Sequence, residues 1–305
     1  MSGCGPPSLP QSTFSVSYTD TYSSSFEVGN LTIVSHEQYS NAPLAFAAVE
    51  VRFPGEGGAG LTPFAQRAFR DELGDQWVIE QMTQREMSIN LMSGEPASQS
   101  IRTQNMPRFV VRDRTSAIMV TPNSVSVETT RYLGWSDFRG TVDAALRATS
   151  KLVGPEGISR LGMRYVNEVR APGAGIKVQD WATWLSPEVL APGIDFMVKA
   201  GYPPVNWTGA AQYAVGQDMQ IVARYGPRPS YVVNPVGPLR RIDPPQDGPL
   251  FVLDFDGFWE PPNIPHFDVD DLLTKCGWLR GPIWALFERI VTERLVDEVF
   301  KKENR

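Results

Sequence analysis

The sequence predicts an α+β protein: an antiparallel sheet or sheets with a meander, packed by two or three long helices. Three observations predict this class. Strand-like and helix-like segments are grouped instead of alternating regularly. The turns within residues 108–132 are too short for anything but antiparallel pairing. Apolar residues recur at helical spacing near residues 137–153 and at the C-terminus. A doubly wound parallel sheet is therefore not expected.

Size and composition indicate a folded core preceded by an arm. The chain has 305 residues, 42% of them hydrophobic and 20% charged, which is typical of a soluble globular protein. Residues 1–40 are rich in Ser, Thr, Pro and Gly and predict an irregular N-terminal arm. We expect a first α+β half over 41–170 and a second over 171–305, ending in a long helix. One continuous domain is the alternative.

The first half begins with a strand over 45–53 and a helix over 63–73. Thr62 is the expected N-cap, and Gly74 the expected C-terminal stop. Alternating apolar residues predict strands within 76–92. A three-stranded meander is expected next. Its strands are 108–112, 116–121 and 125–132, joined by turns at 113–115 and 122–124.

A helix follows over 137–153, and we expect Ser136 to cap it. The next strand, Arg160–Val169, has two different faces. Arg160 and Arg164 share one face with Glu168, while Leu161 and its alternating neighbours share the other. Gly162 lies between the two arginines, where another backbone or a ligand could approach.

The second half is less regular. Residues 180–210 hold three tryptophans among Pro and Gly, with one short helix expected, and 211–225 predicts strand interrupted by a bulge or turn at 216–218. Residues 226–249 are connecting, and 251–256 predicts a strand. We expect a short helix over 269–275, capped by Asp268, and a separate long helix from Pro282 to about Lys301. The recurrence of strands followed by a helix raises the hypothesis of two related halves.

Charge and cysteine content narrow the setting. The net charge of -6 makes nucleic acid an unexpected partner. Cys4 and Cys276 predict no structural disulfide, and the cysteines and histidines lack zinc-site spacing. With no signal-like N-terminus and no apolar run of membrane-spanning length, we expect a cytoplasmic protein that does not bind a membrane. No cofactor and no metal are expected.

Several short motifs together resemble one protein family. They are Asn41–Leu44, Val49–Phe53, Tyr132–Phe138, Arg160–Asn167 and Phe287–Glu293. In this combination the chain resembles a sporadically distributed bacterial family of unknown function that also occurs in phage and mobile elements. The resemblance covers roughly residues 41–300, and the Arg160–Asn167 strand is its most diagnostic motif. It implies a soluble cytoplasmic protein of bacterial or phage origin and supplies no catalytic residues.

The candidate ligand or partner site centres on the arginine-bearing strand face. Arg160 and Arg164, with Glu50 and Arg52 of the first strand, would bind a phosphate, a nucleotide or an acidic peptide. The alternative, which we favour, is a solvated sheet face with salt bridges. A closed triphosphate-binding tunnel is a less favoured arrangement of the same charges, because the first strand offers only Glu50-Val51-Arg52.

Two further groups of residues are candidates. Asp254 and Asp256 point the same way from one strand and would hold Mg²⁺ or Mn²⁺, or pair with the arginines, which we favour. The tryptophans of the irregular region would cover the core or anchor a partner, and the sequence does not separate these two roles. They are Trp181, Trp184 and Trp207.

These features predict a non-enzymatic interaction protein, in phage defence or toxin control as the resemblance suggests. It would bind a protein partner, or itself, through the arginine-bearing face and the aromatic loops. One alternative is a sensor or metal-dependent enzyme acting on a nucleotide or phosphate ligand. Another is a structural component of a phage.

Overall fold

The computed structural model describes residues 39–54, 61–90, 98–174 and 177–301. All of these described residues belong to one compact unit. Most of the expected arm, and the connection at 55–60, lie outside the described residues. The first half contains β1 (Leu44–Arg52), α1 (Pro63–Leu73), β2 (Trp77–Asn90), β3 (Ser98–Val111), β4 (Ser116–Thr121), β5 (Ser124–Thr129), α2 (Trp135–Leu152) and β6 (Arg160–Val169).

The remaining elements follow a long irregular segment. They are two 3₁₀ turns (Val178–Thr183 and Pro187–Val189), α3 (Ile194–Lys199), β7 (Gly209–Gly216), β8 (Met219–Arg228), β9 (Leu250–Trp259), α4 (Val269–Ile290), α5 (Glu293–Leu295) and a terminal π-helical turn (Val296–Phe300).

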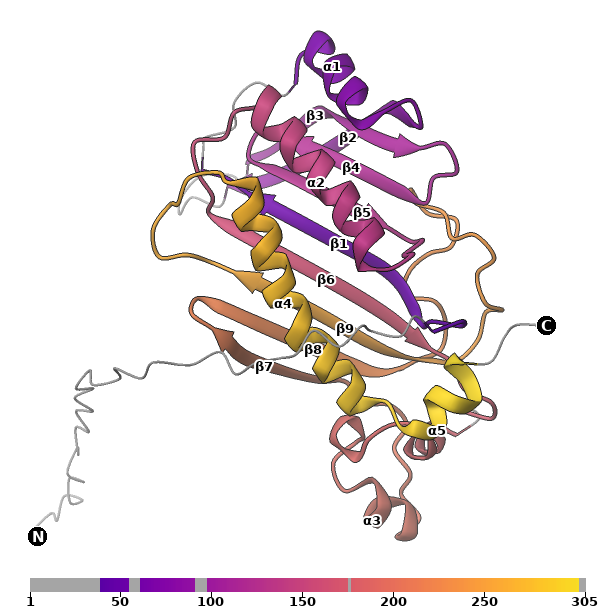
Figure 1. The fold of residues 1–305 in the computed structure, drawn as a ribbon. Coiled ribbons are helices and arrows are strands. Elements are labelled where there is room, and N and C mark those ends of the chain that lie inside the picture. Colours follow the sequence, from indigo (N-terminus) through magenta and orange to yellow (C-terminus); the bar gives the residue numbers. More distant parts are fainter. Residues whose placement is uncertain (1–38, 55–60, 91–97, 175–176, 302–305) are drawn as a thin grey trace, which may run out of the picture. The chain divides into compact units, whose positions relative to one another are not determined.

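The nine strands of the described residues form one antiparallel sheet in the order β2-β3-β4-β5-β1-β6-β9-β8-β7 (Figure 1). The expected α+β class and the meander are thereby confirmed. Strands β2 and β7 lie at the two ends of this order, so the sheet is open and does not close into a tunnel. The two halves meet where β6 of the first half pairs with β9 of the second half.

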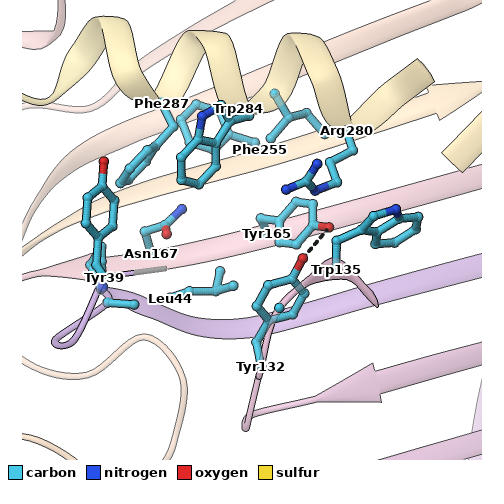
Figure 2. A pocket seen from close by; sticks show the side chains of 14 residues that line it. Tyr39, Leu44, Tyr132, Trp135, Tyr165, Asn167, Phe255, Arg280, Trp284 and Phe287 are labelled. Atoms are coloured by element: carbon cyan, nitrogen blue, oxygen red, sulfur yellow. Dashed lines mark hydrogen bonds between the residues drawn. The ribbon is translucent and has the colours of Figure 1, made fainter. Parts of the chain in front are cut away.

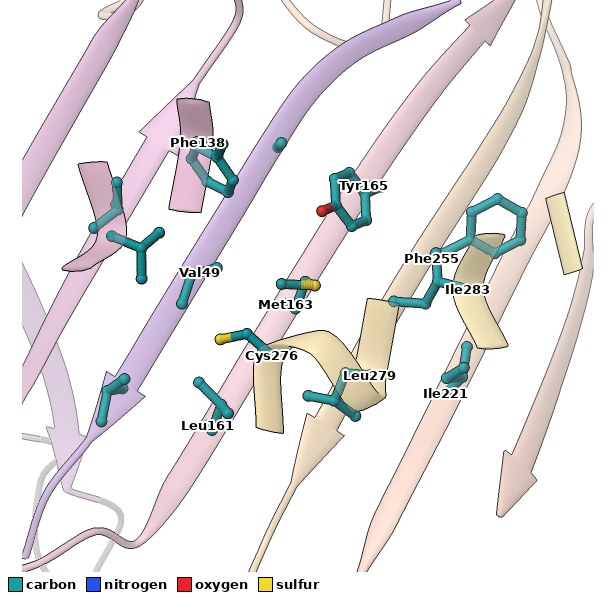
Figure 3. Close-up of a cluster of buried hydrophobic side chains, with 14 of the residues drawn as sticks. Val49, Phe138, Leu161, Met163, Tyr165, Ile221, Phe255, Cys276, Leu279 and Ile283 are labelled. Carbon is teal, nitrogen blue, oxygen red and sulfur yellow. The ribbon is translucent and has the colours of Figure 1, made fainter. Parts of the chain in front are cut away.

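Helices α1, α2 and α4 cover one face of the sheet, as Figure 1 shows. Alternate strand residues such as Val49, Leu161 and Met163 point into this layer and meet Phe138 of α2 and Cys276 of α4 (Figure 3). All five are buried. The period-2 pattern of the strands and the helical stripe of α2 and α4 thus produce a single large core.

Local capping signals decide several of the helix boundaries. Thr62 caps α1, since its hydroxyl accepts from the Ala65 N–H at 3.2 Å. Gly74 ends that helix at a φ of 100°, a conformation that favours glycine. Asp268 caps α4 by accepting from two backbone N–H groups. The expected cap at Ser136 was wrong, because α2 begins at Trp135, two residues before its expected start, and its N-cap, Gly134, has no side chain to offer.

The expected break at Pro282 was also wrong. Helix α4 runs without interruption over 22 residues and ends at Ile290, and a separate short helix follows. Proline removes one helical hydrogen bond at a cost of about 3 kcal/mol. The apolar stripe nevertheless continues across it, from Leu279 to Ile283, and both residues are buried on the sheet. Packing of this stripe outweighs the local preference of proline.

The segment 229–249 crosses one end of the face that the helices leave open. Leu239 packs there against Val110 and Ala117 in a small second cluster. Among the elements that the structure describes, no helix covers the rest of this face (Figure 1). No helix in the described part of the chain is long and apolar enough to cross a bilayer.

Candidate functional site

The open face of the sheet gathers the charged residues that the sequence singled out. Strands β1, β6 and β9 are direct neighbours, so their outward residues form one group. We call this group the polar face and define it by Glu50, Arg52, Arg160, Arg164, Asp254 and Asp256. The structure thus brings together all six charged candidates of the sequence.

Arg164 and Asp254 form a bidentate ion pair on the polar face. The Arg164 Nε and Nη2 atoms donate to the two carboxylate oxygens of Asp254, both at 2.8 Å. This hydrogen bonding raises the pKa of Arg164 above its ordinary value. Asp254 is buried, whereas Arg164 is half-exposed. The preferred hypothesis, that these carboxylates pair with the arginines, is confirmed.

Arg160 fills the space that Gly162 leaves on the strand. A Cβ at Gly162 would lie 2.5 Å from the Arg160 Nη1 atom. The guanidinium also lies 3.5 Å from Glu50, 3.1 Å from Glu260 and 5.0 Å from the centre of the Phe258 ring. In this structure the neighbouring arginine occupies the position beside Gly162, and the approach of a ligand or another backbone to that glycine stays a prediction.

Asp256 is the second aspartate of the polar face, and its carboxylate lies near several arginines. Burial raises the pKa of Asp256, although Arg160, Arg164 and Arg224 act to lower it. Its carboxylate lies 3.9 Å from Arg160. Asp254 and Asp256 thus both face guanidinium groups. Nowhere in the described ranges do three or more His, Cys, Asp or Glu side chains gather as a metal site would require.

Glu168 lies on the same side of β6 but has a structural role. Its side chain is fully buried and accepts from the backbone N–H groups of Val232 and Val233, both at 2.8 Å. Arg241 and Arg170 donate to its second oxygen at 2.6 and 3.2 Å. These contacts fasten the segment 229–249 to the sheet.

The three tryptophans of the irregular segment pack inward. Trp181 and Trp184 are buried, and the guanidinium of Arg294 lies 4.5 Å from the Trp184 ring centre. Trp207 is half-buried and donates from Nε1 to the Val189 carbonyl at 3.0 Å. Trp181 and Trp207 both contact Phe251 of β9. Of the two roles left open by the sequence, the structure shows core cover for these side chains.

Other apolar side chains of the same segment are exposed instead. Phe196 and Met197 of α3 point to solvent, as do Tyr202 and Val205 after it. At the end of α3 the Tyr202 N–H donates to the Met197 carbonyl at 2.8 Å, a helix-ending turn that brings these two residues together. We call these four residues the apolar patch. The sequence pattern pointed to this segment through its tryptophans. It did not indicate which apolar side chains are exposed, because exposure depends on the packing of distant segments.

No protein-family model matches this chain, and a search of curated proteins gives no match. The resemblance drawn from the short motifs stays a prediction.

Proposed function

We propose that this protein is an interaction protein that binds a partner protein through the apolar patch. The observation that carries the proposal is the exposure of Phe196, Met197, Tyr202 and Val205 within ten residues of chain. Aromatic side chains and methionine are enriched where protein interfaces form their buried centres. The partner would offer an apolar groove to receive them.

The buried tryptophans support this proposal because they hold the patch in place. Trp181 and Trp184 precede α3, and Trp207 follows it, so the exposed residues lie between side chains anchored on the core. A segment held at both ends loses little conformational freedom when a partner binds. In Figure 1, α3 lies at one end of the described body and α1 at the other.

The polar face would serve as a secondary contact. Its arginines already have carboxylate partners at Glu50, Asp254 and Asp256, which leaves little uncompensated charge to attract a phosphate. A partner surface that carries both signs would suit this face better than a polyanion. This favours the interaction proposal over the nucleotide-binding alternative.

A matched pair of substitutions tests the proposal. Phe196 and Phe64 have side chains of similar exposure, 72% and 76%, at distant places in the fold. The tagged full-length protein and its Phe196→Asp and Phe64→Asp variants are purified gently from a bacterial host and examined by native mass spectrometry. We expect a stoichiometric partner with wild type and Phe64→Asp, and at least a tenfold loss with Phe196→Asp.

The same measurement shows whether the partner is a second copy of this chain, since a homo-oligomer has a defined mass. The proposal fails if Phe196→Asp keeps every partner and every oligomer that Phe64→Asp keeps.

The setting is part of the proposal. We infer a cytoplasmic protein of bacterial or phage origin, because the motif resemblance implies it and because Cys276 is a buried free thiol. Phage defence or toxin control is the biological role that a patchily distributed interaction protein would fit. Expression of the protein and its Phe196→Asp variant in a phage-challenged host would test that role, and equal phage sensitivity would argue against it.

A further inference from the structure

A cavity of about 190 Å³ lies on the opposite side of the sheet from the polar face, where α4 and the start of α2 meet β1, β6 and β9. Figure 2 shows its arrangement. Tyr39 and Phe287 lie at one end, and Arg280, Tyr132 and Tyr165 lie at the other. The cavity shares no residue with the apolar patch.

One end of the cavity suits a negative charge. Arg280 reaches into it from α4, and its guanidinium lies 5.9 Å from the Trp135 ring centre. Among the described residues no carboxylate lies within ion-pair distance of Arg280, whereas all three arginines of the polar face have such a partner. A half-buried cation of this kind would gain from an anionic ligand.

The start of α2 adds to this preference. Gly134 and Trp135 line the cavity, and the N-cap Gly134 provides no side chain to accept from the first backbone N–H groups. The N-terminus of an 18-residue helix carries partial positive charge. The acidic residue of that first turn, Asp137, is exposed.

Two tyrosine hydroxyls complete the polar end. The Tyr132 and Tyr165 oxygens are 3.5 Å apart. Burial raises the pKa of Tyr165 well above its ordinary value, with a further contribution from Tyr132, so its hydroxyl keeps its proton and can donate. A guanidinium and two phenol groups can donate to the oxygens of one carboxylate.

The rest of the wall is apolar. Leu44, Phe255, Ile283, Trp284 and Phe287 line it, with Asn167 as a single amide among them. Such walls bind a planar or branched hydrocarbon group by burial of its surface. A cavity of about 190 Å³ holds on the order of ten non-hydrogen atoms, well below the size of a nucleotide.

We propose that this cavity binds a small carboxylic acid with an aromatic or branched apolar body, its carboxylate at Arg280 and the first turn of α2 and its body against Trp284 and Phe287. The single guanidinium neutralises one negative charge, so a doubly charged phosphate would leave its second charge desolvated without a partner, and a monoanion is favoured. Binding there would join α4 to α2, and so the second half of the chain to the first.

Three probes of equal size test the proposal in the full-length protein by isothermal titration calorimetry. They are 3-phenylpropanoate, its neutral amide 3-phenylpropanamide, and phenyl phosphate. We expect the acid to bind with a dissociation constant below one millimolar and the other two at least tenfold more weakly. Trp135 and Trp284 line the cavity, so tryptophan fluorescence should change as the acid binds.

Two substitutions assign the binding to this cavity. Arg280→Met keeps most of the side-chain volume and leaves the apolar walls of the cavity in place. It should raise the dissociation constant of the acid at least tenfold. Arg139→Met is the control, because Arg139 is an exposed arginine of α2 that does not line the cavity. The thermal midpoints of both variants establish that they are folded.

The proposal is overturned if no probe binds at millimolar concentration, or if the amide binds as tightly as the acid. Unchanged binding of the acid by Arg280→Met would also overturn it. If phenyl phosphate binds more tightly than 3-phenylpropanoate, the cavity prefers a phosphate to a carboxylate, and the proposal of a monoanionic ligand is refuted.

Discussion

Glu168 is a buried carboxylate that fastens the segment 229–249 to the sheet. Burial acts to raise its pKa, but the Val233 N–H, Arg241 and the Val232 N–H together outweigh it and lower the pKa below its ordinary value. The folded state therefore holds the charged form more strongly than the unfolded state does.

We predict that Glu168→Gln lowers the free energy of unfolding by about 3 kcal/mol at neutral pH, because the amide cannot accept from all four donors. Since the folded pKa is depressed, this stabilisation is present above the unfolded value of about 4.3. It is lost as pH falls through the folded pKa. Urea denaturation across pH 3–8 measures the difference, with the exposed Glu156→Gln as control. A pH-independent difference would contradict the prediction.

Arg164 is expected to matter for stability as well as for contact. Removal of its guanidinium leaves the buried Asp254 carboxylate without its bidentate partner. We predict that Arg164→Met lowers the free energy of unfolding by about 1–2 kcal/mol, a modest value because Arg164 is half-exposed. Arg164→Glu, which adds a second negative charge beside Asp254, should cost more.

Chemical denaturation checks this, with Arg67→Met as a control on helix α1. Arg67 is exposed and has no ion pair within the described ranges. If Arg164→Met and Arg67→Met were equally stable, Asp254 would not depend on its pair. Because Arg164→Glu is expected to destabilise the fold, partner binding by this variant is compared with that of wild type only at temperatures where both are folded.

At the scale of elements, α4 lies close to β9 because Gly257 has no side chain. A Cβ at this position would lie 2.9 Å from the Ile283 Cδ1 atom. Gly277 of α4 differs, because no atom would meet its Cβ within 4 Å. Gly257 is therefore required for close packing, whereas a side chain at Gly277 would affect only the helix propensity of α4.

We predict changes of opposite sign for these two glycines. Gly257→Ala should lower the free energy of unfolding by about 1–3 kcal/mol through overpacking. It should also weaken binding of the acid probe, because Ile283 lines the cavity. Gly277→Ala should raise stability by about 0.5–1 kcal/mol through helix propensity. Thermal and urea denaturation measure the free energy of unfolding of the two variants. If Gly257→Ala were more stable than wild type, α4 could move away from β9 without cost, which would contradict the prediction.

For the whole molecule, the outermost strand β7 is a second place where chains could meet. It ends the sheet order and contains no charged residue and no proline over Gly209–Gly216. Edge strands of soluble proteins usually carry such residues, which prevent pairing with another chain. Tyr213 of β7 is also exposed.

We predict that Ala214→Lys raises the temperature at which the protein aggregates on heating, while its free energy of unfolding changes by less than about 0.5 kcal/mol. Ala214 is exposed, so the lysine meets no core atoms. Light scattering during a thermal scan measures the onset. Ser150→Lys, an equal change of charge on α2, is the control, and an equal shift in both would indicate a general effect of net charge.

The sequence predicted most of this architecture because its signals are local. Short turns at 113–115 and 122–124 require neighbouring antiparallel strands, and alternation in Arg160–Val169 assigns its two faces. Charges on adjacent strands could thus be expected to pair, as Arg164 and Asp254 do.

What sequence reasoning missed depends on contacts between distant segments. Trp181 and Phe196 lie in the same segment, yet one packs on Phe251 and the other faces solvent. Arg280 is one arginine among many until α2 and β6 are placed beside it. The continuation of α4 through Pro282 likewise follows from burial on the sheet and not from local preference.

The position of β6 between β1 and β9 has a consequence for synthesis of the chain. Ribosomes add about 5–20 residues per second, so the interval between the completion of β6 and of β9 is on the order of ten seconds. Throughout it the first half has its own helices, but β6 has one unpaired edge, and Met163 lacks α4 above it. The middle of the finished sheet is therefore the last part to be protected, and nascent chains are most exposed to mispairing and to chaperones at this strand.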